Sequence, residues 1–222
     1  KRHLRLSKVS SSNASQVNNV LHCEIDDDVV RVGAAGRLFH IPADKLCWST
    51  QKADGFRLEH KIRLIAADGS DCDVQTTSPW HLTEHGPVCV TLKTTGSWLK
   101  SDKSRLADFD CRLSFYANSH TAKLEVSIHN PCRARHPGGL WDLGDAGSEH
   151  FRSLTVEISH PDSVEAWLKP VPVDEALSIT TEKSLLIYQD SSGGENWQSR
   201  NHSNAEGNTT VRFRGYRTQV DS

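Results

Sequence analysis

The sequence of 222 residues contains no methionine and no long apolar run. The missing methionine favours a fragment cut from a longer protein over a chain whose modified methionines are not written out. No stretch approaches the roughly 18 apolar residues that a membrane-spanning segment needs. The basic start, Lys1–Arg5, is not followed by the apolar segment of a signal peptide. We therefore expect a soluble chain.

An excess of charge of one sign is also lacking. The chain has 26 lysines and arginines against 28 acidic residues, a formal net charge of −2. Proteins that bind nucleic acid or anionic membranes through electrostatics carry clustered basic residues and a positive surface. We therefore expect neither nucleic acid nor a membrane among the partners of this protein.

Cysteines at the short spacings of a zinc site are absent, so we expect no structural metal. An even number of cysteines permits disulfides, but several lie in strand-like runs, where cysteine acts as a small buried hydrophobe. We favour free thiols in a reducing compartment, the cytoplasm. The acidic run Asp26–Asp28 lacks the further acidic ligands of a calcium site and is predicted as a turn. No cofactor is expected. The six cysteines are Cys23, Cys47, Cys72, Cys89, Cys111 and Cys132.

Helical periodicity is missing, and alternation with a period of two replaces it. Successive side chains of a strand point to opposite faces of the sheet, so such alternation predicts strands with one buried face. Only residues 173–179 could form a short helical turn. The strong runs are residues 56–66, 88–93, 108–115, 123–128 and 154–159. Weaker candidates are residues 20–25, 29–32, 37–41, 164–168, 184–189 and 210–216.

These strands predict an all-β fold, a large antiparallel β-sandwich of the supersandwich kind with little helix. We expect residues 20–222 to form this domain. Residues 1–19 are predicted as an N-terminal arm, because Ser7–Asn19 has the polar, serine- and asparagine-rich composition of a linker.

Two long polar loops, each built around one tryptophan, interrupt the strands. The first runs from His129 to Asp145. Loops longer than about 12–15 residues in a compact domain are usually functional or disordered. Leu140 and Trp141 are too apolar for a disordered segment, so we expect this loop to be folded.

The first loop has two interpretations. Arg133, Arg135 and His136 could bind a carboxylate, because the guanidinium fork of arginine matches the two carboxylate oxygens. Alternatively, the two arginines pair with acids of the same loop, Asp142 and Asp145, and the loop only braces itself.

The second loop, residues 190–208, places Trp197 near hydrogen-bonding side chains. Sugars present apolar C–H faces surrounded by hydroxyls, so an aromatic ring beside amide and guanidinium groups suits them. Arg200, Asn201 and His202 would supply those groups. The alternative is a long mobile hairpin whose tryptophan packs onto the sheet.

Histidine is the side chain best suited to proton transfer near neutral pH. The chain has twelve histidines, so only those of the loops gain weight, namely His129, His136 and His202. The histidines of the strands, such as His60, are most simply surface or strand-edge residues. Neither a Gly-x-Ser-x-Gly nucleophile motif nor a glycine-rich phosphate loop is present.

The two loops carry a resemblance to a known family. The run HNPCRARHPGGLWDLGD at residues 129–145, the segment from Gly194 to His202, and Arg212–Tyr216 resemble the YetA-like, or exo-rhamnogalacturonan lyase-like, family (polysaccharide lyase family 26). With the strand start at residues 86–88, the resemblance covers roughly residues 20–216. It implies a protein with a β-barrel, a central β-sandwich and an α/α toroid. This chain resembles the sandwich, with residues 1–19 as a possible last strand of the barrel.

The resemblance implies eliminative cleavage of rhamnogalacturonan, the acidic backbone of pectin. Elimination at galacturonate requires the carboxylate to be neutralised, the C5 proton to be removed and the departing O4 to be protonated. From residue type we expect catalytic roles for His136, His202 and Arg200. For binding we expect Arg133, Arg135, Trp141, Asp142, Asn196, Trp197 and Asn201.

The expected partners are an acidic polysaccharide or oligosaccharide and neighbouring domains of the same polypeptide. The chain by itself is expected to be inactive if its cleft is shared with the toroid. Two alternatives stay open: a carbohydrate-binding module without catalysis, and a scaffold whose loops dock the toroid.

Overall fold

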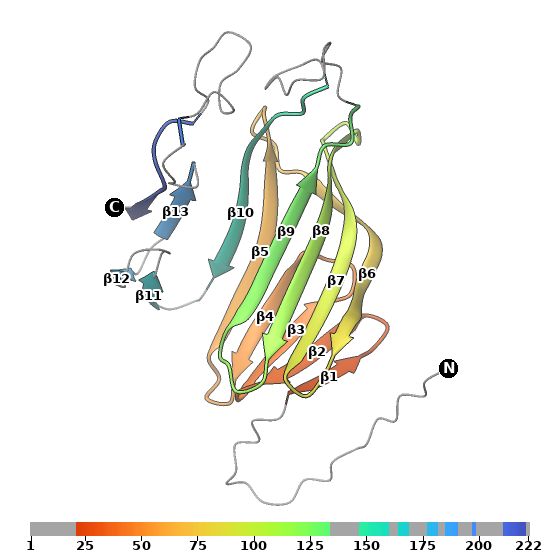
Figure 1. Cartoon of the computed structure of the whole chain (residues 1–222), viewed down its shortest axis with the longest axis vertical. Coiled ribbons are helices and arrows are strands. Elements are labelled where there is room, and N and C mark those ends of the chain that lie inside the picture. Colours follow the sequence, from red (N-terminus) through yellow and green to blue (C-terminus); the bar gives the residue numbers. More distant parts are fainter. Residues whose placement is uncertain are drawn as a thin grey trace, which may run out of the picture.

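The computed structural model describes residues 21–133, 147–159, 164–168, 177–181, 185–190, 197–198 and 211–220. Within these residues the fold is all-β, and two antiparallel sheets face each other as a sandwich (Figure 1). The sequence prediction of an all-β sandwich is confirmed. In the described part of the chain, no helix has the length and apolar character of a membrane span.

The first sheet has six strands in the order β1-β2-β3-β4-β5-β10. Its strands are β1 (His22–Ile25), β2 (Val29–Ala34), β3 (Arg37–Pro42), β4 (Cys47–Lys52), β5 (Arg57–Ala66) and β10 (Phe151–Ser159). The second sheet has four consecutive strands in the order β6-β7-β8-β9. These are β6 (Asp73–His85), β7 (Cys89–Leu99), β8 (Arg105–Tyr116) and β9 (Ala122–His129). The whole second sheet therefore lies between β5 and β10 in the sequence.

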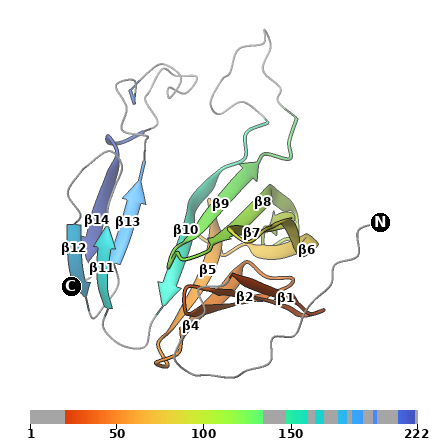
Figure 2. The same ribbon diagram turned by 60° about the horizontal axis from the view of Figure 1, so that its bottom comes forward.

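Two separate hairpins follow the sandwich in the chain. Strand β11 (Val164–Leu168) pairs with β12 (Leu177–Thr181), and β13 (Leu185–Gln189) pairs with β14 (Tyr216–Val220). Both views place these hairpins on the side of the sandwich where β10 lies (Figures 1 and 2). The strands that flank the second loop in the sequence thus stand beside the edge of the first sheet.

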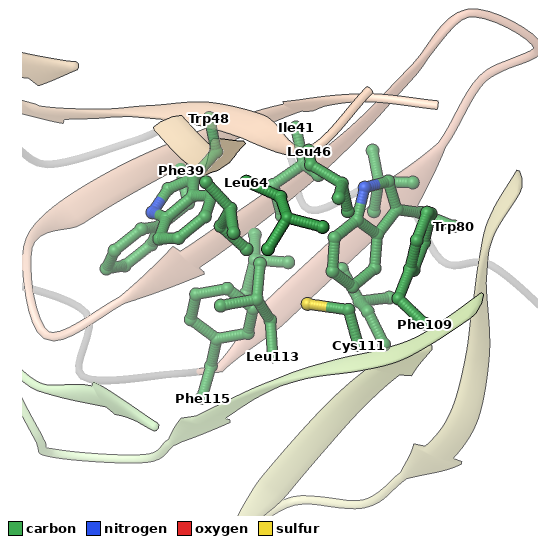
Figure 3. Close-up of a cluster of buried hydrophobic side chains, with 14 of the residues drawn as sticks. Phe39, Ile41, Leu46, Trp48, Leu64, Trp80, Phe109, Cys111, Leu113 and Phe115 are labelled. Carbon is green, nitrogen blue, oxygen red and sulfur yellow. The ribbon is translucent and has the colours of Figure 1, made fainter. Parts of the chain in front are cut away.

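The core lies between the two sheets and is built by the alternation seen in the sequence. In β8, Phe109, Cys111, Leu113 and Phe115 are all buried. Figure 3 shows side chains of both sheets meeting there. Phe39 of the first sheet contacts Phe115 of the second, with ring centroids 4.7 Å apart. The predicted inward face of β8 is confirmed.

Some strands differ from the prediction. Strand β6 was not predicted because most of its side chains are polar and exposed and its pairing with β7 is interrupted by register shifts. Strand β4 was also missed, and residues 177–181 form strand β12 where a helical turn was considered. The last strand starts at Tyr216, later than predicted, because Gly215 has a φ of 70° and leaves the extended conformation.

Strand β10 forms as predicted, but its apolar face is open. Val156 is 45% exposed and Ile158 63% exposed. β10 is the last strand of the first sheet, and on this face only Leu154, nearer the start of the strand, packs against the core among the three predicted apolar residues.

His60 was predicted as a surface or strand-edge residue, but it lies in β5, an interior strand of the first sheet. Its ring stacks on Trp48, with centroids 4.9 Å apart and an angle of 6° between the planes. The ring atom Nε2 is 3.0 Å from the hydroxyl of Thr50. Burial lowers the pKa of His60, because an imidazolium ion is poorly solvated there.

Protonation of His60 should therefore oppose folding. An unfolded histidine has a pKa of about 6.5, so stability is full above that pH and falls as the pH drops through it toward the lower folded pKa. We expect the free energy of unfolding to fall more between about pH 7.5 and about pH 5.5 in the wild type than in His60→Gln. Urea unfolding followed by tryptophan fluorescence measures this difference. The variant His85→Gln, at an exposed position, should keep the wild-type pH dependence, and identical behaviour of all three proteins would contradict the assignment.

Candidate functional site

The β13–β14 hairpin carries a pocket of about 330 Å³, which we call the hairpin pocket. Leu186 and Tyr188 are two residues apart on β13, and Arg217 and Gln219 are two residues apart on β14. The register pairs Tyr188 with Arg217 and Leu186 with Gln219. Residues at this spacing share one face of a hairpin. Arg212 and Phe213, from the segment before β14, complete the lining.

Asp190 fixes that segment against the end of β13. Its carboxylate accepts hydrogen bonds from the backbone amide of Arg212 and from the hydroxyl of Tyr188, the latter at 2.9 Å. Its own amide donates to the carbonyl of Gly215 at 3.2 Å. Burial alone would raise the pKa of Asp190, but the hydrogen bonds outweigh this effect and lower it. The pocket is therefore held by an ionised carboxylate.

Each arginine of the hairpin pocket lies over an aromatic ring. The guanidinium carbon of Arg217 is 4.1 Å from the centroid of Phe213, and that of Arg212 is 5.3 Å from the centroid of Tyr188. The two rings meet edge to face, with centroids 5.7 Å apart. Such stacking orders a guanidinium group and leaves its N–H edge available for a ligand.

Tyr188 links the charged groups of the pocket. Arg212 Nη2 donates a hydrogen bond of 2.7 Å to the phenolic oxygen, while the phenol donates to Asp190. The bond to Tyr188 is the main cause of the raised pKa of Arg212. Arg212 is 3.7 Å from Asp190, but its side chain is 71% exposed. The guanidinium group is thus oriented by its neighbours and open to solvent.

This chemistry fits an acidic sugar. Two aromatic rings can contact the apolar C–H face of a sugar ring, and a guanidinium fork can bind a carboxylate with two hydrogen bonds. The amide of Gln219 can donate to or accept from hydroxyl groups. A volume of about 330 Å³ lies at the lower end of the range for small-molecule sites.

Most of the predicted site residues lie outside the described residues, so those roles stay predictions. Trp197 is described and half-buried, and Arg133 is described and exposed. Tyr188, Arg217 and Gln219 were not predicted as site residues. The signal available in the sequence was the strand predicted at residues 184–189, which places Leu186 and Tyr188 on one face. The predicted residues outside the described part are Arg135, His136, Trp141, Asp142, Asn196, Arg200, Asn201 and His202.

The two ends of the first loop are joined at its base. Asn130 Nδ2 donates to the carbonyl of Gly147 at 2.7 Å, and Asn130 Oδ1 accepts from the amide of Cys132 at 2.8 Å. Glu149 accepts a hydrogen bond from Lys100 at 2.9 Å. This bond is the main cause of the lowered pKa of Glu149. The loop thus leaves the sandwich from a fixed base.

On the second sheet, charged side chains form ion pairs with one another. On the outer face of the second sheet, Lys93 Nζ lies 2.5 Å from Asp110 and Lys123 Nζ lies 2.9 Å from Glu125. In the described residues, no group of three histidines, cysteines or acids is placed to hold a metal ion.

Cys111 is a free thiol inside the core, and burial raises its pKa to about 12, so it is a poor nucleophile.

No protein-family model and no curated protein matches the chain. The functional argument therefore depends on the chemistry of the described residues.

Proposed function

We propose that this chain is the β-sandwich domain of a polysaccharide-lyase-like protein and binds an acidic, pectin-type glycan at the hairpin pocket. One observation carries the proposal: Arg212 and Arg217 each lie over an aromatic ring of the same pocket. The resemblance of the loops and of Arg212–Tyr216 to the exo-rhamnogalacturonan lyase-like family points to the same class of ligand.

The charge of the pocket selects an acidic over a neutral sugar. Of its two arginines, Arg212 is partly balanced by Asp190, whereas Arg217 lies against the uncharged ring of Phe213. The carboxylate of a uronate would supply the negative charge that pairs with Arg217. The aromatic rings then favour a sugar over a small free carboxylate, because they offer apolar contact to its C–H face.

Affinity for an acidic oligosaccharide tests the proposal. Isothermal titration with digalacturonate and with rhamnogalacturonan oligosaccharides should show binding, and a neutral galactose oligosaccharide should bind much more weakly. Arg217→Gln and Arg212→Gln should each weaken binding about tenfold, because a charge-assisted hydrogen bond contributes about 1.5–3 kcal/mol.

The matched control is Arg57→Gln, which removes the same charge from an exposed pair with Glu59 on β5. It should leave the affinity unchanged. Equal affinity of the wild type and both pocket variants, or equal affinity for neutral and acidic sugars, would contradict the proposal.

A second function, β-elimination in the same pocket, is favoured by Tyr188. Arg212 donates to its phenolic oxygen, and the phenol in turn donates to the carboxylate of Asp190, so the hydroxyl group lies between a cation and a proton acceptor. In such a reaction the phenolic oxygen takes the C5 proton of the uronate while its own proton passes to the Asp190 carboxylate, the C4–O4 bond breaks, a C4=C5 double bond forms, and the departing O4 takes a proton from water. The ultraviolet absorbance of this unsaturated product should rise with the wild type and stay flat with Tyr188→Phe. Binding without any rise in absorbance supports the binding function alone.

A further inference from the structure

A second pocket lies at one end of the sandwich, where three turns meet. It has a volume of about 380 Å³, and we call it the sandwich-end pocket. Figure 1 shows the β4–β5 and β8–β9 turns at the same end of the molecule. A neighbouring cavity of about 490 Å³ shares Gly36, Arg37, Lys52 and Ala53 with it. The lining residues are Ala35, Gly36, Arg37, Lys52, Ala53, Asp54 and His120.

The local sequence places the two basic residues side by side. Ala35 and Gly36, with φ angles of 48° and 74°, form the two-residue turn between β2 and β3. Two positive φ angles are typical of the tight turns that match the twist of a hairpin. Arg37 follows as the first residue of β3, and the register sets it directly opposite Lys52 of β4.

Two positive charges facing each other across neighbouring strands destabilise a sheet. In the described part of the chain, neither Arg37 nor Lys52 forms an ion pair with an acid. The ammonium group of Lys52 instead lies over the ring of Phe56, 4.7 Å from its centroid. Elsewhere in the sandwich, several basic residues have acidic partners: Arg31 pairs with Asp26, Arg57 with Glu59 and Lys103 with Asp73.

Arg37 also has an unsatisfied donor. Its Nε atom is buried and, among the described residues, has no hydrogen-bond partner. A buried donor without a partner is unfavourable, because it has given up its hydrogen bonds to water. Asp54 lines the same pocket, but its Oδ1 atom accepts from the backbone amide of Phe56 at 3.0 Å. The pocket thus combines a like-charge pair with an unused N–H group.

We propose that the sandwich-end pocket binds a tetrahedral oxyanion, a phosphate or sulfate group. Such an anion would compensate the facing charges of Arg37 and Lys52, and two cations outweigh the single carboxylate of Asp54. His120 comes from the β8–β9 turn of the other sheet, so donors reach the pocket from both sheets. A tetrahedral group directs its oxygens to several sides, whereas the two oxygens of a carboxylate lie in one plane.

Ligand-dependent stability tests this site. Inorganic phosphate and sulfate, compared with acetate and chloride at matched ionic strength, should raise the melting temperature of the wild type along a saturating curve. Lys52→Gln should weaken the phosphate affinity at least tenfold, as should Arg37→Gln. Because Arg37 is half-buried and its replacement could disturb the turn, the Lys52 variant is decisive. Heteronuclear NMR titration of the wild type and of Lys52→Gln gives the same affinities without heating.

The matched control is Lys61→Gln, an exposed lysine of β5 outside the pocket. It should retain the wild-type affinity. Equal stabilisation of all variants would mean a general salt effect, and acetate binding as tightly as phosphate would mean a carboxylate site; each result would overturn the proposal. A parallel titration with a sugar phosphate and a sulfated monosaccharide distinguishes a free anion from an esterified one. The variants leave the hairpin pocket intact, so failure here is separate from failure of the proposed function.

Discussion

Replacing Gly96 by alanine should destabilise the sandwich by about 3 kcal/mol or more. Gly96 lies in β7, paired with Thr76 of β6 on one side and Phe109 of β8 on the other. An added Cβ would overlap the backbone carbonyl oxygen of Gln75 and lie 2.6 Å from Cζ of Phe109. The carbonyl cannot rotate away without breaking the ladder. Phe109 cannot move freely because it is buried, with its ring 4.8 Å from that of Trp98.

Gly33→Ala is the matched control for this prediction. Gly33 also lies in a strand, but its added Cβ would meet the Cβ of His22 at 3.8 Å, an ordinary contact. The free energy of unfolding of Gly33→Ala should differ from that of the wild type by less than about 0.5 kcal/mol. Urea unfolding followed by circular dichroism gives both values, and a similar cost for the two alanines would show that β6 does not approach β7 as closely as described.

Replacing Phe115 by alanine should cost about 3–5 kcal/mol. Phe115 is fully buried and contacts Phe39 across the interface of the two sheets. Its truncation removes apolar contacts from both sheets and leaves a cavity that the strands cannot close. Phe115→Leu retains much of the volume and should cost less, about 1–2 kcal/mol.

The neighbouring residue provides a control on the other face of the same strand. Tyr116 is 37% exposed, so Tyr116→Ala should cost less than about 1 kcal/mol. Thermal and urea unfolding of the three variants measure the differences. If Phe115→Ala and Tyr116→Ala were equally destabilised, the inward face assigned to β8 would be wrong.

The sequence predicted strands well where their two faces differ strongly. Residues 108–115 alternate sharply, and all the apolar members are buried, joined among the polar members only by Ser114. Strand β6 has the opposite character, with polar residues on both faces, Pro79 within it and an interrupted register. Local alternation carries no signal for such a strand, because its extended conformation depends on pairing with β7.

The hairpin pocket was predictable only in part, because its contacts join residues far apart in the sequence. The family resemblance includes the arginine and aromatic residues of Arg212–Tyr216, but their partners Tyr188 and Asp190 lie more than twenty residues earlier. The pairing of Arg37 with Lys52 has the same origin, since only the register of β3 and β4 sets them opposite each other. Residue type indicates the chemistry, and strand pairing decides which groups meet.

The position of the second sheet between β5 and β10 has a consequence for how the chain folds. Neighbours within β6-β7-β8-β9 are joined by short turns and close small loops. Strands β5 and β10, in contrast, form one ladder although residues 67–150 separate them in the sequence. Long-range pairing of this kind is entropically expensive and slows folding. We therefore expect the β6-β7-β8-β9 sheet to assemble before the first sheet is complete, with the pairing of β10 onto β5 as a late step.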